Sequence, residues 1–171
     1  MNYLYIIGQI FGIIAVILGF LTYQMKTQKQ IMIVLITTCF VFTTHYFLIG
    51  AMTGCILNFV GGIRCICFLN RDGKKLLHRL YPAIFALIMA GMGILFWEDW
   101  YSFLAVGGLV INTLCIALKN PQSIRKSILI TSPMVLAYDI IVKSYGGAVY
   151  ESVAIISAVI GLIRYKEKQM R

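Results

Sequence analysis

Charged residues are scarce in this sequence: they form 12% of the 171 residues, against 60% hydrophobic residues. A soluble domain carries about 25% charged residues, so this composition excludes a protein whose main solvent is water. In the hydrocarbon of a bilayer, only helices and closed barrels satisfy every backbone polar group. The long apolar runs lack the two-residue alternation of barrel strands. The sequence therefore predicts an all-α integral membrane protein.

Catalytic and metal-binding signatures are missing as well. The sequence has no HExxH, no Gly-x-Ser-x-Gly, no phosphate-binding glycine loop and no long soluble segment to house an active site. Cysteines inside apolar runs behave as small buried hydrophobic residues. All the cysteines lie in such runs, at Cys39, Cys55, Cys65, Cys67 and Cys115. We therefore expect no enzyme, no disulfide framework, no metal site and no other cofactor.

What the sequence does contain is a series of seven apolar runs, each close to the roughly 20 helical residues that cross a bilayer. The first run has no basic leader and no small-residue cleavage pattern, so we interpret it as a retained span and not as a signal peptide. Between the second and third runs, Gly50 to Gly54 leave room only for a tight turn. The predicted spans are Leu4–Gln24, Ile31–Gly50, Ala51–Leu69, Tyr81–Trp97, Trp100–Leu118, Ser127–Val142 and Ala148–Ile163.

The basic residues sort to one side of these seven spans. Thirteen of the 15 lysines and arginines fall on that side, and we expect Arg64 to extend to lipid phosphate or water there. Lys143 falls on the other side, together with Glu98 and Asp99. Since positive charge accumulates in cytoplasmic loops, the N-terminus is predicted outside the cytoplasm and the C-terminus inside. The thirteen are Lys26, Lys29, Arg71, Lys74, Lys75, Arg79, Lys119, Arg125, Lys126, Arg164, Lys166, Lys168 and Arg171.

The net charge of +9 does not indicate a nucleic-acid-binding protein. The basic residues lie in short clusters between apolar runs and form no stripe along a folded face, which nucleic-acid binding requires. Membrane lipids are the partners that this distribution predicts.

A weak internal repeat relates the two ends of the chain. QMKTQKQIMIVLITT resembles PQSIRKSILITSPM, and FLIGAMTGCILNFVGGIR resembles SYGGAVYESVAIISAVIGLIR, which pairs Gly50 with Gly147. Equivalent spans are four apart, so both units have the same orientation in the membrane, as in parallel repeats. We predict a first three-helix repeat at residues 1–69, a basic cytoplasmic loop and linker helix at 70–99, and a second three-helix repeat with a basic cytoplasmic tail at 100–171. Chance similarity between apolar helices is the alternative.

The segments YQMKTQKQ and THYFLIGAMTGCILNFVGGIR, together with the length, resemble the YgjV-type family of bacterial inner-membrane proteins over nearly the whole chain. That family is similar in topology to the SWEET and PQ-loop transporters, in which two three-helix bundles joined by a linker helix pass a small polar solute between them. The resemblance implies this 3+1+3 arrangement and the bacterial inner membrane. The sequence departs from the SWEET pattern in its prolines: Pro121 is assigned to a basic loop and only Pro133 to the interior of a span.

Polar residues within the predicted spans are the candidate functional groups, because they are expensive in hydrocarbon. Asn58 and Asn112 lie nearest the middle of their spans, where amides could bind a polar solute between the bundles. SWEET relatives place an asparagine on the third span, which Asn58 matches by position. Asp139 and His45 lie about one turn inside the outer ends of related spans and are candidates for proton coupling. The alternatives are an interhelical hydrogen bond for each amide and structural pairing of Asp139 with His45 or Lys143.

Two functions fit these observations. The first is a transporter or facilitator of a small polar solute that works by alternating access, and the second is a non-transporting membrane sensor or an assembly or scaffold protein. Fold analogy favours the transporter. One chain supplies both bundles, so a monomer can suffice, and a dimer is the alternative. We also expect close helix packing where small residues recur, as at Gly8 and Gly12.

Overall fold

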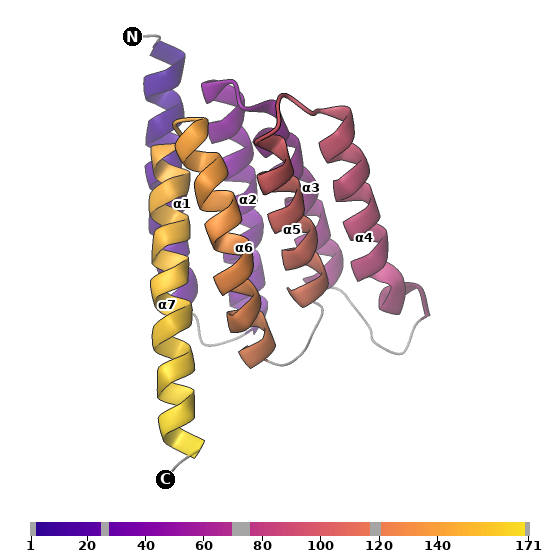
Figure 1. Cartoon of the computed structure of the whole chain (residues 1–171), viewed down its shortest axis with the longest axis vertical. Coiled ribbons are helices and arrows are strands. Elements are labelled where there is room, and N and C mark those ends of the chain that lie inside the picture. The colour runs from indigo at the N-terminus through magenta and orange to yellow at the C-terminus, as the bar shows by residue number, and fades with distance from the viewer. Residues whose placement is uncertain (1–2, 25–27, 70–75, 117–120, 170–171) are drawn as a thin grey trace.

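A computed structural model describes residues 3–24, 28–69, 76–116 and 121–169, and these residues form seven helices (Figure 1). The helices are α1 (Tyr3–Gln24), α2 (Gln28–Ile49), α3 (Met52–Leu69), α4 (Leu76–Leu95), α5 (Ser102–Ile116), α6 (Pro121–Ile141) and α7 (Tyr145–Gln169). Each of the seven predicted spans falls on one of them. Leu118 and the basic residues Lys26, Arg71, Lys74, Lys75, Lys119 and Arg171 lie outside the described residues.

Three of the helices are long and apolar enough to cross a membrane, over Tyr3–Leu21, Met32–Ile49 and Met52–Leu69. Shorter apolar stretches occupy α4, α5 and α7, at Arg79–Leu95, Ser102–Cys115 and Tyr145–Ile160. The helical character of the chain is therefore confirmed.

Several helix boundaries differ from the predicted spans. Helix α6 begins at Pro121 and not at Ser127, and α7 continues to Gln169. A hydropathy pattern marks only the part of a helix that suits hydrocarbon, while the hydrogen-bonded helix continues into polar sequence. The assignment of Pro121 to a loop was wrong, because proline is well suited to the first position of a helix. Pro82 also lies inside a helix, so Pro133 is not the only internal proline.

The helices run up and down between two ends of the molecule, and the two termini lie at opposite ends (Figure 1). We call one end the turn end; it contains the connections at residues 50–51, 96–101 and 142–144. We call the other the basic end; α2, α4 and α6 begin there, with Lys29, Arg79 and Lys126 exposed near their starts. Gly50 has a φ of 83°, which glycine adopts without strain, and it forms the tight turn predicted between α2 and α3.

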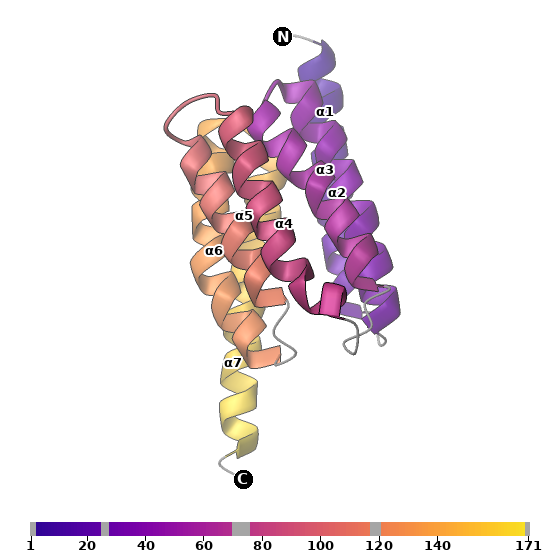
Figure 2. The same cartoon turned by 90° about the vertical axis from the view of Figure 1, so that its right-hand side faces the viewer.

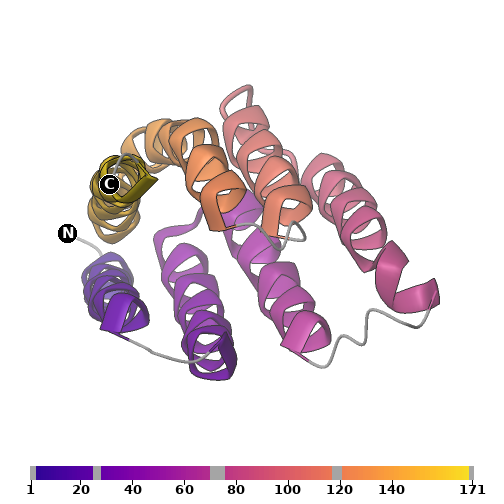
Figure 3. The same ribbon diagram turned by 90° about the horizontal axis from the view of Figure 1, so that it is seen from below.

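The helices pack as two rows. Helix α2 lies between α1 and α3 in a three-helix row, and α7, α6, α5 and α4 follow one another in a four-helix row (Figure 3). The rows touch along both edges: α1 packs against α7, and α3 packs against α4 and α5. Figure 2 shows α4 at one of these edges, between the α1–α3 and α5–α7 sets. Side chains of α2 and α6 meet between these two edges, as Tyr46 and Asp139 do.

Apolar side chains cover the outside of both rows. More than half of the side-chain surface is exposed at Ile10, Ile13 and Ile17 on α1 and at Leu87 and Ile94 on α4. The side chains between the rows include a buried apolar core, with Leu57 and Met89 at 0% exposure. An apolar exterior of this kind suits lipid as the surrounding solvent.

Two glycines bring the backbones of the two rows close together. A methyl group added to Gly146 on α7 would overlap the backbone of Gly12 on α1, so neither position has room for a side chain. Gly8, one turn away, faces the backbone and side chains of α2. The predicted role of Gly8 and Gly12 in close helix packing is confirmed.

Candidate functional site

A group of buried polar side chains joins the two rows near the turn end. We call it the turn-end cluster; it consists of His45, Tyr46, Tyr138, Asp139 and Ser144, each at most 3% exposed. The first two come from α2, and the others come from α6 and the turn that follows it. The cluster thus contains both residues predicted for proton coupling, His45 and Asp139, and brings them to one place.

The hydrogen bonds of His45 define its tautomer. Nδ1 lies 2.7 Å from the carbonyl oxygen of Gly8, which can only accept, so Nδ1 carries a hydrogen. Nε2 lies 2.7 Å from Oγ of Ser144, a hydroxyl that can donate or accept. The site therefore accommodates both the neutral imidazole and the imidazolium, without a change in partners.

Asp139 has one strong hydrogen bond and one oxygen atom without a partner. Its Oδ1 accepts a hydrogen bond from the Tyr46 hydroxyl at 2.5 Å, while its Oδ2 is buried and has no hydrogen-bond partner. A buried carboxylate normally has several donors around it. Glu151 on α7 is also close enough to interact electrostatically with Asp139. Oδ2 is thus a buried acceptor that no donor satisfies.

Neither structural pairing considered for Asp139 occurs among the described residues. No ion pair joins Asp139 to His45. They are linked indirectly: Tyr46, which follows His45 in the sequence, donates a hydrogen bond to Asp139, and Ser144, in the turn after α6, hydrogen bonds with His45. The Lys143 side chain is exposed. Lys143 instead adopts a left-handed backbone conformation, with a φ of 58°, and its carbonyl oxygen accepts hydrogen bonds from Tyr5 and Gln9 of α1.

Tyrosine rings extend the cluster toward α3 and α5. The Tyr138 hydroxyl accepts a hydrogen bond from the backbone N–H of Gly54 at 2.9 Å. Its ring packs between those of Tyr46 and Tyr101, at centroid distances of 6.2 and 6.0 Å. Nearby, Thr53 on α3 hydrogen bonds with Ser102 on α5 at 3.0 Å, and both are fully buried. These contacts hold α2 and α3 of the three-helix row against α5 and α6 of the four-helix row.

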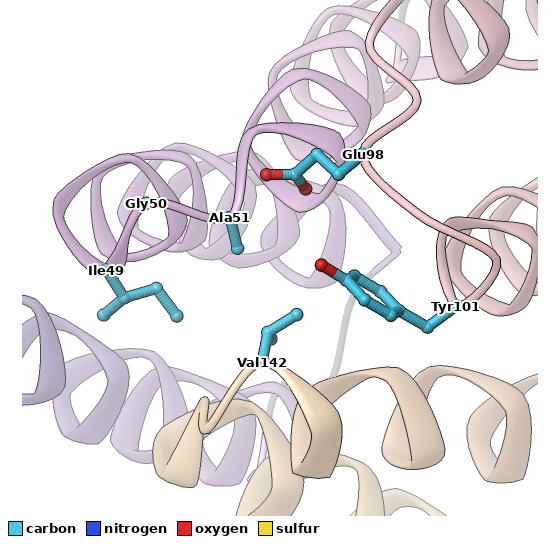
Figure 4. A pocket seen from close by; sticks show the side chains of 6 residues that line it. All are labelled: Ile49, Gly50, Ala51, Glu98, Tyr101 and Val142. Carbon is cyan, nitrogen blue, oxygen red and sulfur yellow. The ribbon is translucent and has the colours of Figure 1, made fainter.

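A cavity of about 190 Å³ opens at the turn end, next to these tyrosines. Its lining residues are Ile49, Gly50, Ala51, Glu98, Tyr101 and Val142, and Figure 4 shows the polar ends of Glu98 and Tyr101 directed into it. The Glu98 carboxylate also accepts hydrogen bonds from the first two N–H groups of α3, on Met52 and Thr53, each at 3.0 Å. Burial, together with the charges of Glu98 and Asp99, raises the pKa of Tyr101, which stays protonated as a donor.

The basic half of the interface contains a different group, centred on Arg64. Its side chain does not reach lipid or water as expected: it is 5% exposed and donates from Nη1 to Oγ1 of Thr113 on α5 at 2.6 Å. Nη2 lies 3.7 Å from the Cys65 sulfur, and Nε has no partner. The expectation was wrong because Arg64 faces the other row, and sequence alone does not fix which way a helix is rotated.

The two amides predicted to bind solute are both half-buried. The Asn58 side chain donates to the Gly54 carbonyl oxygen of its own helix at 2.9 Å. Asn112 lies on α5, directly before Thr113. Within the described part of the chain no hydrogen bond joins the two amides, and the cavity at the turn end is not lined by either. Their role in solute binding stays a prediction.

Sequence reasoning missed the partners of the candidate residues. Tyr46 and Thr113 are ordinary residues of apolar helices, and Ser144 is an ordinary turn residue, until the rows are assembled. The one available signal was adjacency: a tyrosine directly follows His45, and another directly precedes Asp139. Among the residues that the structure describes, no three histidine, cysteine or acidic side chains gather into a potential metal site.

Comparison with known proteins adds one finding. The family model Imp-YgjV, described as bacterial inner membrane protein, matches residues 6–169. No curated protein and no solved structure matches the chain. The match covers all seven helices, so it concerns the whole architecture and not one segment.

Proposed function

Because this chain belongs to the Imp-YgjV family of bacterial inner membrane proteins, we propose that it is a SWEET-like transporter or facilitator of a small polar solute. In this proposal residues 1–69 and 100–171 form two three-helix units, and residues 70–99 supply the linker between them. The units rock against each other, which opens the path between them first to one side of the membrane and then to the other.

The observation that carries this proposal is the turn-end cluster. Packing alone would be served by apolar side chains, since buried polar groups stabilise a membrane protein only modestly. Here a histidine, an aspartate and two tyrosines are fully buried between the rows, with Oδ2 of Asp139 left unpaired. Such groups are typical of substrate and proton pathways in membrane transporters.

Each candidate residue has a place in the proposal. The turn end faces outward, and the interrow hydrogen bonds of the cluster close the path on that side. Asp139 and His45 exchange the coupling proton, and its binding at Asp139 weakens the bond from Tyr46 so that the rows can separate. Asn58 and Asn112 bind the solute nearer the middle of the path. One chain supplies both units, so the working form is a monomer in the lipid bilayer.

The test begins with the purified protein in lipid nanodiscs and a panel of polar metabolites, scored by the rise in melting temperature. Solutes that stabilise the protein are then measured for flux into liposomes. We expect flux to fall in Asn58→Ala and Asn112→Ala and to lose its dependence on a proton gradient in Asp139→Asn. Ser152→Ala is a matched control, because the Ser152 hydroxyl bonds only within its own helix, to the Ala148 carbonyl.

If no solute binds and all three variants keep the cellular role of the protein, the transporter proposal fails and a sensor or scaffold takes its place. The orientation has its own test. Reporter fusions at each end of the chain should place the N-terminus outside the cytoplasm and the C-terminus inside. Two ends in the same compartment would contradict the threading on which the proposed path depends.

A further inference from the structure

Arg64 is a buried cation that the described residues leave without a counter-ion. It is 5% exposed, and its partners are the Thr113 hydroxyl and the Cys65 thiol, neither of which carries a balancing charge in its ordinary form. Within the described parts of the chain no carboxylate forms an ion pair with it. A guanidinium keeps its charge in proteins, and an unpaired buried charge is strongly unfavourable. An anion at this position would remove that penalty.

The free edge of the guanidinium indicates which kind of anion fits. Thr113 occupies Nη1, whereas Nε has no partner and Nη2 makes only a long contact to sulfur. Nε and Nη2 form one edge of the planar group, and this edge donates two parallel hydrogen bonds to the two oxygens of a carboxylate or phosphate. A spherical anion such as chloride cannot use both donors in this way.

Arg64 lies near the basic end of its helix. It precedes the end of α3 at Leu69 by five residues, which corresponds to about 7.5 Å along the helix axis. Lys29 and Lys126 are exposed at the same end of the molecule. Positive charge at that end raises the local concentration of anions.

We propose that Arg64 binds a small oxyanion, a carboxylate or phosphate group, through its Nε and Nη2 edge, and that the solute which this protein moves carries such a group. The second half of this inference rests on the proposed transport function. The first half, the binding site, stands without it.

The experiment uses the full chain in nanodiscs of zwitterionic phosphatidylcholine at constant ionic strength. Acetate, succinate and inorganic phosphate are compared with chloride and with glucose in melting-temperature and calorimetric titrations. We expect at least one oxyanion to stabilise the protein with increasing concentration, while chloride and glucose do not. Arg64→Gln should weaken that binding about tenfold to a hundredfold. Lys29→Gln, which removes the same charge at the exposed basic end, should leave it within about twofold.

Arg64→Lys keeps the charge and loses the planar pair of donors, so we expect it to bind the oxyanion more weakly than the native protein. If Arg64→Gln does not fold, the anion panel on the native protein and the Arg64→Lys variant still decide. Equal binding of chloride, or no binding of any oxyanion, would overturn the inference. A phospholipid found tightly bound by native mass spectrometry, and not displaced by free oxyanions, would assign the edge to a lipid headgroup and would also overturn it.

The outcomes separate this inference from the transport proposal. Flux of a neutral solute without oxyanion binding would contradict the Arg64 site and leave transport in place. Oxyanion binding without flux of any solute would leave the site in place and contradict transport.

Discussion

At the turn end the two rows meet through backbone contact and buried hydrogen bonds, whereas in the basic half they meet through apolar packing, such as Phe68 against Phe85, and the polar contact of one arginine. Gly12 and Gly146 touch at the first of these places, and His45, Tyr46 and Thr53 hydrogen bond across it. At the second, Arg64 reaches across to Thr113 and keeps one donor unpaired. The hydrogen bonds between the two rows are therefore more fully satisfied at the turn end than in the basic half.

This difference indicates which half of the interface between the rows would respond to a bound ligand. A contact in which nearly every donor has an acceptor and no side chain separates two backbones has one favourable arrangement. A contact that leaves a charge uncompensated gains free energy when a partner arrives. We infer that the turn end is the tightly closed part of the interface, which opens only when a proton reaches Asp139, while the basic half is the part that an anionic ligand would alter.

The largest expected effect is at the contact between Gly12 and Gly146. Gly146→Ala should destabilise the protein by about 1–3 kcal/mol, because the added methyl group meets the backbone of Gly12, which cannot move aside like a flexible side chain. The measurement is the free energy of unfolding from denaturant titration in mixed micelles.

Gly91→Ala on α4 is the matched control for this change. A methyl group there meets nothing within 4 Å, so alanine should be neutral or should stabilise the helix by about 0.5–1 kcal/mol. Equal effects of the two substitutions would show that the rows do not depend on close contact at Gly146.

The next largest effect is expected at Tyr46. Tyr46→Phe removes the short hydrogen bond that Oδ1 of Asp139 accepts from the Tyr46 hydroxyl, and should cost about 1–3 kcal/mol. Asp139→Asn should cost less, because its amide oxygen can still accept from Tyr46 and its charge is gone. Both are measured by the same titration, with Tyr3→Phe at an 83% exposed tyrosine as the control. A larger loss in Asp139→Asn than in Tyr46→Phe would mean that the carboxylate charge itself stabilises the rows.

The parts of this structure that could be predicted from sequence are those that depend on local chemistry. The apolar runs predicted the helices, and the spacing of Gly8 and Gly12 predicted a close helix contact. The position of an ionisable residue within an apolar span identified Asp139 as a candidate functional residue. The rest depends on how helices rotate and which ones meet. Tyr46 and Asp139 are separated by 93 residues in sequence, and Arg64 and Thr113 by 49, so no local pattern relates them. The boundary of α6 was missed for another reason: a helix continues where hydropathy falls.

A smaller effect is expected at the start of α3. Glu98→Gln keeps one acceptor and loses both the second acceptor and the negative charge that faces the N-terminus of the helix, which should cost about 0.3–1 kcal/mol. Asp99→Asn changes the same charge in the same loop, but Asp99 accepts from Trp100 beside it and not from α3. Unfolding of both variants at low and high salt should show a salt-dependent loss for Glu98→Gln that exceeds that of Asp99→Asn.

The smallest effect is expected in the basic half, from Thr113→Val. The substitution removes the acceptor for Arg64, and interhelical hydrogen bonds in membrane proteins contribute about 0.6 kcal/mol on average. The other bonds of the Thr113 hydroxyl, to the Leu109 carbonyl oxygen and the Met89 sulfur, lie within the four-helix row and do not hold the rows together. Denaturant titration should therefore separate Thr113→Val clearly from Tyr46→Phe. A loss as large as that of Tyr46→Phe would mean that Arg64 fastens the rows as firmly as the turn-end cluster does, and the contrast between the two halves of the interface would disappear.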